Sequence, residues 1–119
     1  MIPSFLLAKL YVKGSLKNND NGFEFALKNI IDSTMLIGIG PIASGEKSYE
    51  DAAITMKLAD KSVNGAELSR SNSVPVRMGV PITVLVAGEK LGTGAQKITV
   101  AATTSDIGKI KFDISDTVA

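Results

Sequence analysis

Apolar and polar residues alternate with a period of two along most of this chain, as in half-buried β-strands. The alternation covers residues 10–17 and residues 23–28, with Asn18–Gly22 between them. Asn-Gly pairs supply the positive φ angles that tight hairpin turns need. The pattern therefore predicts that the first two stretches form a β-hairpin.

The last third of the chain has the same period. Residues 82–87 are apolar on both faces, which is typical of a central strand. A glycine-rich turn is expected at 88–95. Alternation at 98–102 and 110–114, on either side of the turn at 105–108, predicts a second hairpin.

In the middle of the chain, residues 35–42 predict a buried strand, whereas residues 48–61 are compatible with either a helix or a strand. Residues 35–42 are apolar and contain Gly38, Gly40 and Pro41, consistent with a buried strand that ends in a bulge or turn. Within 48–61, Ser48–Asp51 resembles a helix cap, whereas Ile54, Met56 and Leu58 alternate as in a strand. We favour a short turn at 48–52 followed by a strand.

The rest of the middle is more irregular. Residues 64–73 are polar and predict a loop, with one helical turn near 66–69. Residues 74–80 contain Pro75 and precede Pro81, so they predict an edge strand or an extended connection.

These stretches add up to seven or eight short strands, with turn signals at the spacing of about 8–12 residues that is typical of a sandwich or barrel. The predicted fold is all-β, an antiparallel β-sandwich that is immunoglobulin-like or jelly-roll-like. Its 119 residues suit one domain, over 1–119. The paired cysteines and core tryptophan of antibody domains are missing.

The amino-acid composition excludes several kinds of catalytic and metal-binding site. The chain has no histidine, no cysteine and no tryptophan, which excludes Ser-His-Asp and Cys-His catalysis, thiol redox chemistry and His/Cys metal sites. With 45% apolar residues, 21% charged residues and a net charge of +1, it resembles an ordinary globular protein.

Basic residues form no run and no apolar stretch could span a bilayer, so we expect neither nucleic acid nor a membrane as partner. The N-terminus lacks the features of a signal peptide, and a cytoplasmic location is the default expectation.

Three short motifs suggest ligands, but each has a simpler structural interpretation. Gly38–Ala43 reads G-x-G-x-x-A, the dinucleotide-binding pattern, without the helix that this pattern requires. Gly88–Lys97 lacks the order of a phosphate-binding loop. Glu50 and Asp51 are the nearest candidates for a carboxylate pair or a cation site. We expect turns and strands in all three places, no catalytic residue, and no cofactor or metal.

Five residues are candidates for an interaction surface. Phe5 and Leu6 belong to an apolar N-terminal patch with Ile2 and Leu7, which either extends the first strand into the core or faces a partner. Tyr11 lies among Lys9, Lys13 and Lys17, a series expected on one solvated strand face. Arg70 and Arg77 lie in the loop at 64–77, where arginines suit interfaces.

Gly22-Phe23-x-Phe25-x-Leu27-x-Asn29, then Gly45-Glu46, then Gly88-x-x-Leu91-x-x-Gly94-x-x-x-Ile98 resembles small bacterial β-sandwich proteins. The family it is most similar to is the small subunit of C-glycoside deglycosidases, over residues 20–115. This chain has Gln96 where such sandwiches often have an aromatic residue or histidine. The resemblance implies an accessory role beside a separate barrel subunit that carries the metal and the catalytic groups, and it transfers no catalytic residue.

The expected function is therefore non-catalytic. We expect a β-sandwich that acts by protein association, either as a homo-oligomer or as an accessory subunit of a larger catalytic partner. One alternative is a small ligand- or carbohydrate-binding module, for which Tyr11 and Tyr49 would be the aromatic platforms. Another is a carboxylate-dependent enzyme using Glu50 or Asp51.

Overall fold

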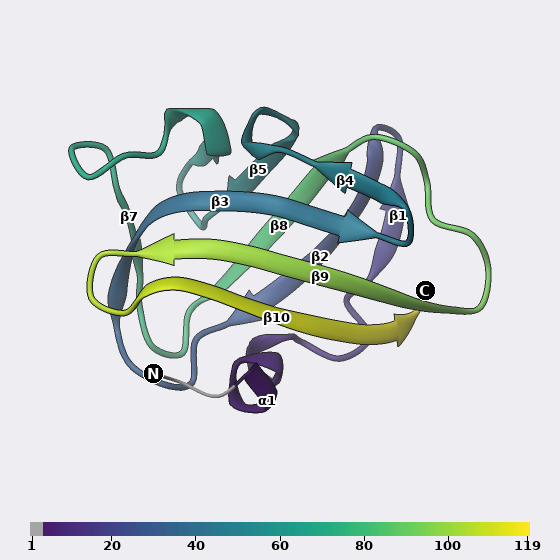
Figure 1. The fold of residues 1–119 in the computed structure, drawn as a ribbon, viewed down its shortest axis with the longest axis horizontal. Coiled ribbons are helices and arrows are strands. Elements are labelled where there is room, and N and C mark those ends of the chain that lie inside the picture. The colour runs from purple at the N-terminus through teal and green to yellow at the C-terminus, as the bar shows by residue number, and fades with distance from the viewer. Residues whose placement is uncertain (1–3) are drawn as a thin grey trace.

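A computed structural model describes residues 4–119 as two antiparallel β-sheets packed face to face (Figure 1). The all-β sandwich expected from the alternation is confirmed. One sheet has the order β1-β2-β8-β5-β6 and the other β10-β9-β3-β4, with β7 also paired to β3. The strands are β1 (Lys17–Asn19), β2 (Gly22–Lys28), β3 (Thr34–Ser44), β4 (Lys47–Tyr49), β5 (Ile54–Lys57), β6 (Ser62–Asn64), β7 (Val74–Val76), β8 (Pro81–Ala87), β9 (Ala95–Thr104) and β10 (Gly108–Thr117). The short helices are α1 (Ser4–Leu7), η1 (Ala8–Leu10), η2 (Asp51–Ala53) and η3 (Gly65–Glu67).

The described residues contain more strands than the seven or eight expected from the pattern. Four of them, β1, β4, β6 and β7, are only three residues long. A segment of this length shows too few alternations to be recognised as a strand, and it forms because a longer neighbour offers unpaired backbone groups.

The predicted N-terminal hairpin exists, but its first strand is short. β1 pairs with β2 from Lys17↔Glu24 to Asn19↔Gly22. The expectation of a strand through residues 10–16 is wrong. That segment contains η1, a single bridge between Tyr11 and Leu27, and a turn at Gly14, whose φ of +86° interrupts extended backbone.

The segment starts at the end of η1 and not in a strand, and the leucine at its start follows helical spacing. Leu7 is buried and Leu10, three residues later, packs against the same core. Such i, i+3 positions share one side of a helical turn. Lys9, Lys13 and Lys17 therefore do not share a strand face: they lie in η1, in the turn and in β1.

β8 is the middle strand of its sheet, as its apolar pattern predicts. Ile82, Val84 and Val86 point into the core. The β9–β10 hairpin is also confirmed, with ten paired positions from Gly108↔Thr104 to Thr117↔Ala95.

β3 continues through the Gly38–Ala43 motif instead of ending there. Its pairing with β9 shifts register between Leu36 and Gly38 and again between Ile39 and Ile42. The glycines lie within a strand, so the turn into a helix that dinucleotide binding needs is missing at this motif.

The remaining middle segments agree with the favoured interpretation. Residues 48–61 contain the end of β4, the single turn η2 and then strand β5. The helical turn in the polar loop is η3, where Asn64 and Glu67 form a capping box. β7 pairs with β3 at Thr34↔Val76 through Leu36↔Val74, as an extended edge segment.

Candidate interaction site

Three loops meet at one end of the sandwich. They are the β2–β3 loop (29–33), the β7–β8 loop (77–80) and the β9–β10 turn (105–107). The registers place Lys28 opposite Pro81, Thr34 opposite Val76 and Gly108 opposite Thr104, which brings the three loops to the same end.

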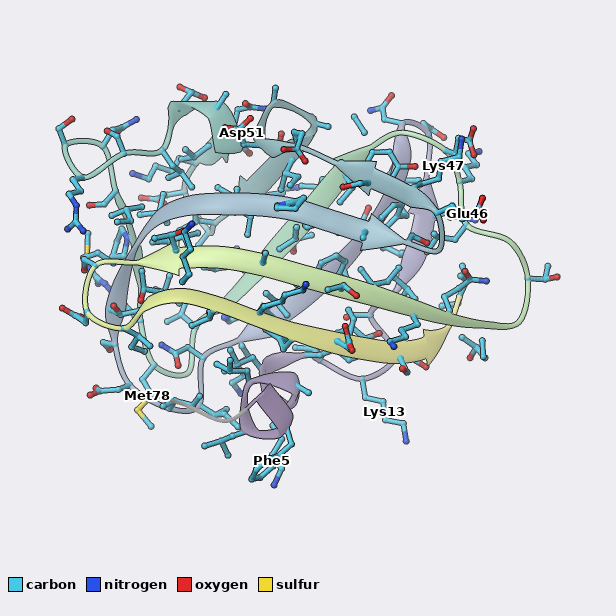
Figure 2. The ribbon with its side chains drawn as sticks, viewed as in Figure 1. Phe5, Lys13, Glu46, Lys47, Asp51 and Met78 are labelled. Carbon is cyan, nitrogen blue, oxygen red and sulfur yellow. The ribbon has the colours of Figure 1, made fainter. Side chains whose placement is uncertain are left out.

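The loops at this end carry four of the five large apolar side chains that are exposed among residues 4–119. The fifth, Phe5 on α1, is 70% exposed and lies beside Lys111 and Asp113 of β10, so it projects from the long side of the sandwich (Figure 2). Met78 is the most exposed of the four, at 56%. The others are Ile30, Val80 and Ile107. We call the three loops together with α1 the apolar end.

Hydrogen bonds hold these loops in place. The buried Asn29 side chain donates to the carbonyl oxygens of Asp32 and Val76 and accepts from the Ile31 N–H at 3.0 Å. The Gly79 N–H donates to the Asn29 carbonyl oxygen at 2.8 Å, which joins the β7–β8 loop to the β2–β3 loop. The apolar side chains are therefore displayed by an ordered backbone.

A second ordered contact secures the β9–β10 turn. The Thr34 hydroxyl donates to Asp106 Oδ2 at 2.9 Å, and the Ser105 N–H donates to the Met35 carbonyl oxygen at 2.9 Å. A group of exposed apolar side chains on an ordered framework is typical of an interaction site, because exposing them to water is unfavourable unless a partner covers them.

The opposite end of the sandwich is polar. Lys47 Nζ lies 3.1 Å from Glu89 Oε1, which links the β3–β4 hairpin to the β8–β9 loop. The Asn18 side chain exchanges two hydrogen bonds with the backbone of Leu91, at 2.7 and 3.0 Å. Glu46 and Lys47 project from this end in Figure 2. None of the five exposed large apolar side chains lies at this end.

The structure brings only some of the predicted interaction residues to the apolar end. Phe5 lies there, Leu6 beside it is half-buried, and Arg77 directly precedes Met78. Arg70 is exposed in a separate turn closed by the Ser69–Asn72 bridge. Ile2, which belongs to the N-terminal patch of the sequence, lies outside the described residues.

Sequence reasoning missed four residues of the apolar end: Ile30, Met78, Val80 and Ile107. A usable signal was present, since Met78 and Ile107 each directly precede a glycine in a turn. A large apolar residue at such a turn has no strand face on which to be buried.

Tyr11 has a structural role in joining the N-terminal segment to β10. Its hydroxyl donates to Asp116 Oδ2 at 2.7 Å and accepts from the Leu16 N–H at 3.0 Å. The Gly14 N–H also donates to Asp116 Oδ2, at 2.8 Å. The Gly14 and Tyr11 donors hold the pKa of Asp116 below its ordinary value. Burial, and then the Asp116 carboxylate, raise the pKa of Tyr11.

Replacing Tyr11 with phenylalanine is expected to raise the pKa of Asp116 part of the way toward its ordinary value, because one of two donors to Oδ2 is lost. A lowered carboxyl pKa stabilises the folded chain above the ordinary value of about 4, and this contribution disappears as the pH falls through the lowered value. Carboxyl ¹³C NMR titration of both proteins measures the shift. An unchanged midpoint would contradict the role assigned to the tyrosine.

Neither tyrosine offers an exposed platform for a sugar. The Tyr49 ring packs edge-on against Phe23 with ring centroids 5.9 Å apart, and it also lies against Gly88. The Tyr11 ring packs against Phe25 with centroids 6.5 Å apart. Both rings are half-buried, which removes the aromatic surfaces that motivated the carbohydrate-binding alternative.

Glu50 and Asp51 are exposed around the start of η2. Within residues 4–119, no group of three or more acidic side chains is placed so that it could hold a metal ion. No helix in the described part of the chain is long and apolar enough to cross a membrane.

Comparison with known proteins gives one family. A family model described as "Hydroxymethylglutaryl-CoA reductase, N-terminal domain" matches residues 6–119. This span includes every strand of the sandwich and the residues of the apolar end except Phe5. No curated protein matches the chain. The match gives no support to the resemblance to the small subunit of C-glycoside deglycosidases.

Proposed function

This chain belongs to the hydroxymethylglutaryl-CoA reductase N-terminal domain family, and on that premise we propose that it acts without catalysing a reaction itself. Its proposed role is protein association: the apolar end docks against the catalytic part of a hydroxymethylglutaryl-CoA reductase. The sequence supports a non-catalytic role, since it offers neither imidazole nor thiol.

The observation that carries the proposal is the segregation of exposed apolar side chains. Four of the five occupy loops at one end that hydrogen bonds hold in place, and Phe5 lies on α1, which adjoins these loops through Leu7. The other end has an ion pair and polar turns. Interface cores are enriched in aromatic residues and methionine, of which Phe5 and Met78 are the exposed examples here. Arg77, beside Met78, suits the rim of such an interface.

Removing the two most exposed apolar side chains is expected to weaken this association. The double variant Phe5→Ser/Met78→Ser should bind a separately produced reductase catalytic polypeptide at least about tenfold more weakly than the wild-type chain, because such anchors contribute more than about 1 kcal/mol each. Both residues are exposed, so the melting temperature should change little. Isothermal titration calorimetry measures the affinity.

The matched control is Glu46→Ser/Lys47→Ser at the polar end, which should bind like the wild type. Light scattering of the chain alone tests self-association through the same surface, the homo-oligomeric form of the proposal. Equal affinities for the apolar-end and polar-end variants would contradict the proposed function. So would a wild-type chain that is monomeric and binds no catalytic polypeptide.

A further inference from the structure

A cavity lies between the two sheets, directly behind the apolar end. Its volume is about 90 Å³. Both sheets and the N-terminal segment contribute to its wall, which includes Leu7, Leu27, Leu36, Met56, Val84 and Ala102. Ile31 and Ile107, from two of the loops of the apolar end, also line it.

The buried polar side chains of the wall are bonded to partners within the chain. The Asn29 amide is engaged by Asp32, Val76 and Ile31. The Thr104 hydroxyl accepts from the Ile107 N–H at 3.0 Å and donates to the Gly108 carbonyl oxygen.

The other two polar side chains of the wall, Asp32 and Thr34, are not buried. The Thr34 hydroxyl donates to Asp106, and the Asp32 carboxylate accepts from the Ser33 N–H at 2.8 Å. Among the described residues, no buried side-chain nitrogen or oxygen lacks a partner. A ligand that needs hydrogen bonds would lose those it makes with water and gain none from the buried part of the wall.

We infer that this cavity binds a small uncharged hydrocarbon group of about three or four carbon atoms. A dry apolar cavity of about 150 Å³ accepts benzene, so a volume of about 90 Å³ suits a smaller guest. Water is a poor occupant because it needs two to four polar partners. A hydrocarbon gains dispersion contacts with the wall. This inference stands independently of the proposed function, which concerns the outer surface of the same end.

The test adds xenon or butane to the full chain and measures binding by methyl NMR. Both probes should cause saturable shifts of the methyl groups of Leu36 and Val84 in the wild type. Ala102→Leu adds side-chain atoms to the wall of the cavity and should weaken binding of both probes at least tenfold. The matched control is Ala101→Leu, on the opposite, half-exposed face of β9, which should bind as the wild type does.

A second variant covers the case in which Ala102→Leu does not fold. Val100→Ile enlarges another wall residue by only one methylene and should weaken binding severalfold.

A further experiment with 1-hexanol distinguishes two sources of the hydrocarbon group. Shifts that extend to Ile107 indicate the end of a longer alkyl chain, whereas binding of butane alone indicates a free small hydrocarbon. An absence of saturable shifts in the wild type, or equal shifts in folded Ala102→Leu, would overturn the inference.

Discussion

Replacing Phe23 with alanine is expected to lower the free energy of unfolding by about 3–5 kcal/mol. Phe23 is fully buried on β2, and its ring packs against that of Tyr49 with centroids 5.9 Å apart. The substitution removes apolar contacts and also leaves a void that the rigid sheets on either side cannot fill by collapsing. Because a domain has only about 5–15 kcal/mol of stability, this is a large fraction of the total.

Urea denaturation followed by circular dichroism measures the effect. The matched control is Phe5→Ala, the same chemical change at a side chain that is 70% exposed, which should alter the free energy of unfolding by less than about 0.5 kcal/mol. Comparable losses in the two variants would mean that the core is not where the structure places it.

Replacing Gly22 with alanine is expected to destabilise the chain by about 3 kcal/mol or more, because a side chain there has no free space. Gly22 pairs with Ala87 on the central strand, and a Cβ atom would overlap the carbonyl oxygen of Val86. This obstacle is backbone, so relieving the overlap requires β2 and β8 to separate where both are anchored in the core.

The expected signature is a lower urea midpoint with an unchanged dependence on urea concentration, which denotes a loss of stability without a change in the surface exposed on unfolding. Gly92→Ala is the matched control, since a Cβ atom at that exposed loop position would meet only Gln96 Nε2, at 4.0 Å. If Gly22→Ala unfolds at the same urea concentration as Gly92→Ala, the close approach of β2 to β8 is refuted.

Gly22 also shows how a correct prediction can rest on an incomplete reason. The Asn-Gly pair predicts the hairpin through positive φ angles at the turn. In the structure, Asp20 and Asn21 connect the strands without positive φ, whereas Gly22, the first residue of β2, has a φ of +156°. The glycine is therefore required twice: by its positive φ, which the local pattern indicates, and by the close approach of the Val86 carbonyl oxygen, which no local pattern contains.

The sequence by itself determined the all-β class, the β9–β10 hairpin and the central position of β8. These features depend on local alternation, since each strand shows by itself which of its faces is buried. The same local reasoning was wrong for residues 10–16, where leucines at helical spacing and the turn at Gly14 override the alternation.

Only the tertiary structure decided which residues meet. Tyr11 bonds Asp116 from 105 positions away, and the apolar end gathers α1 and three loops that are widely separated along the chain. Met78 and Ile107 are exposed because of the way the ends of the strands align across the two sheets. Strand pairing and sheet packing set that alignment, and neither is encoded in the period of any one segment.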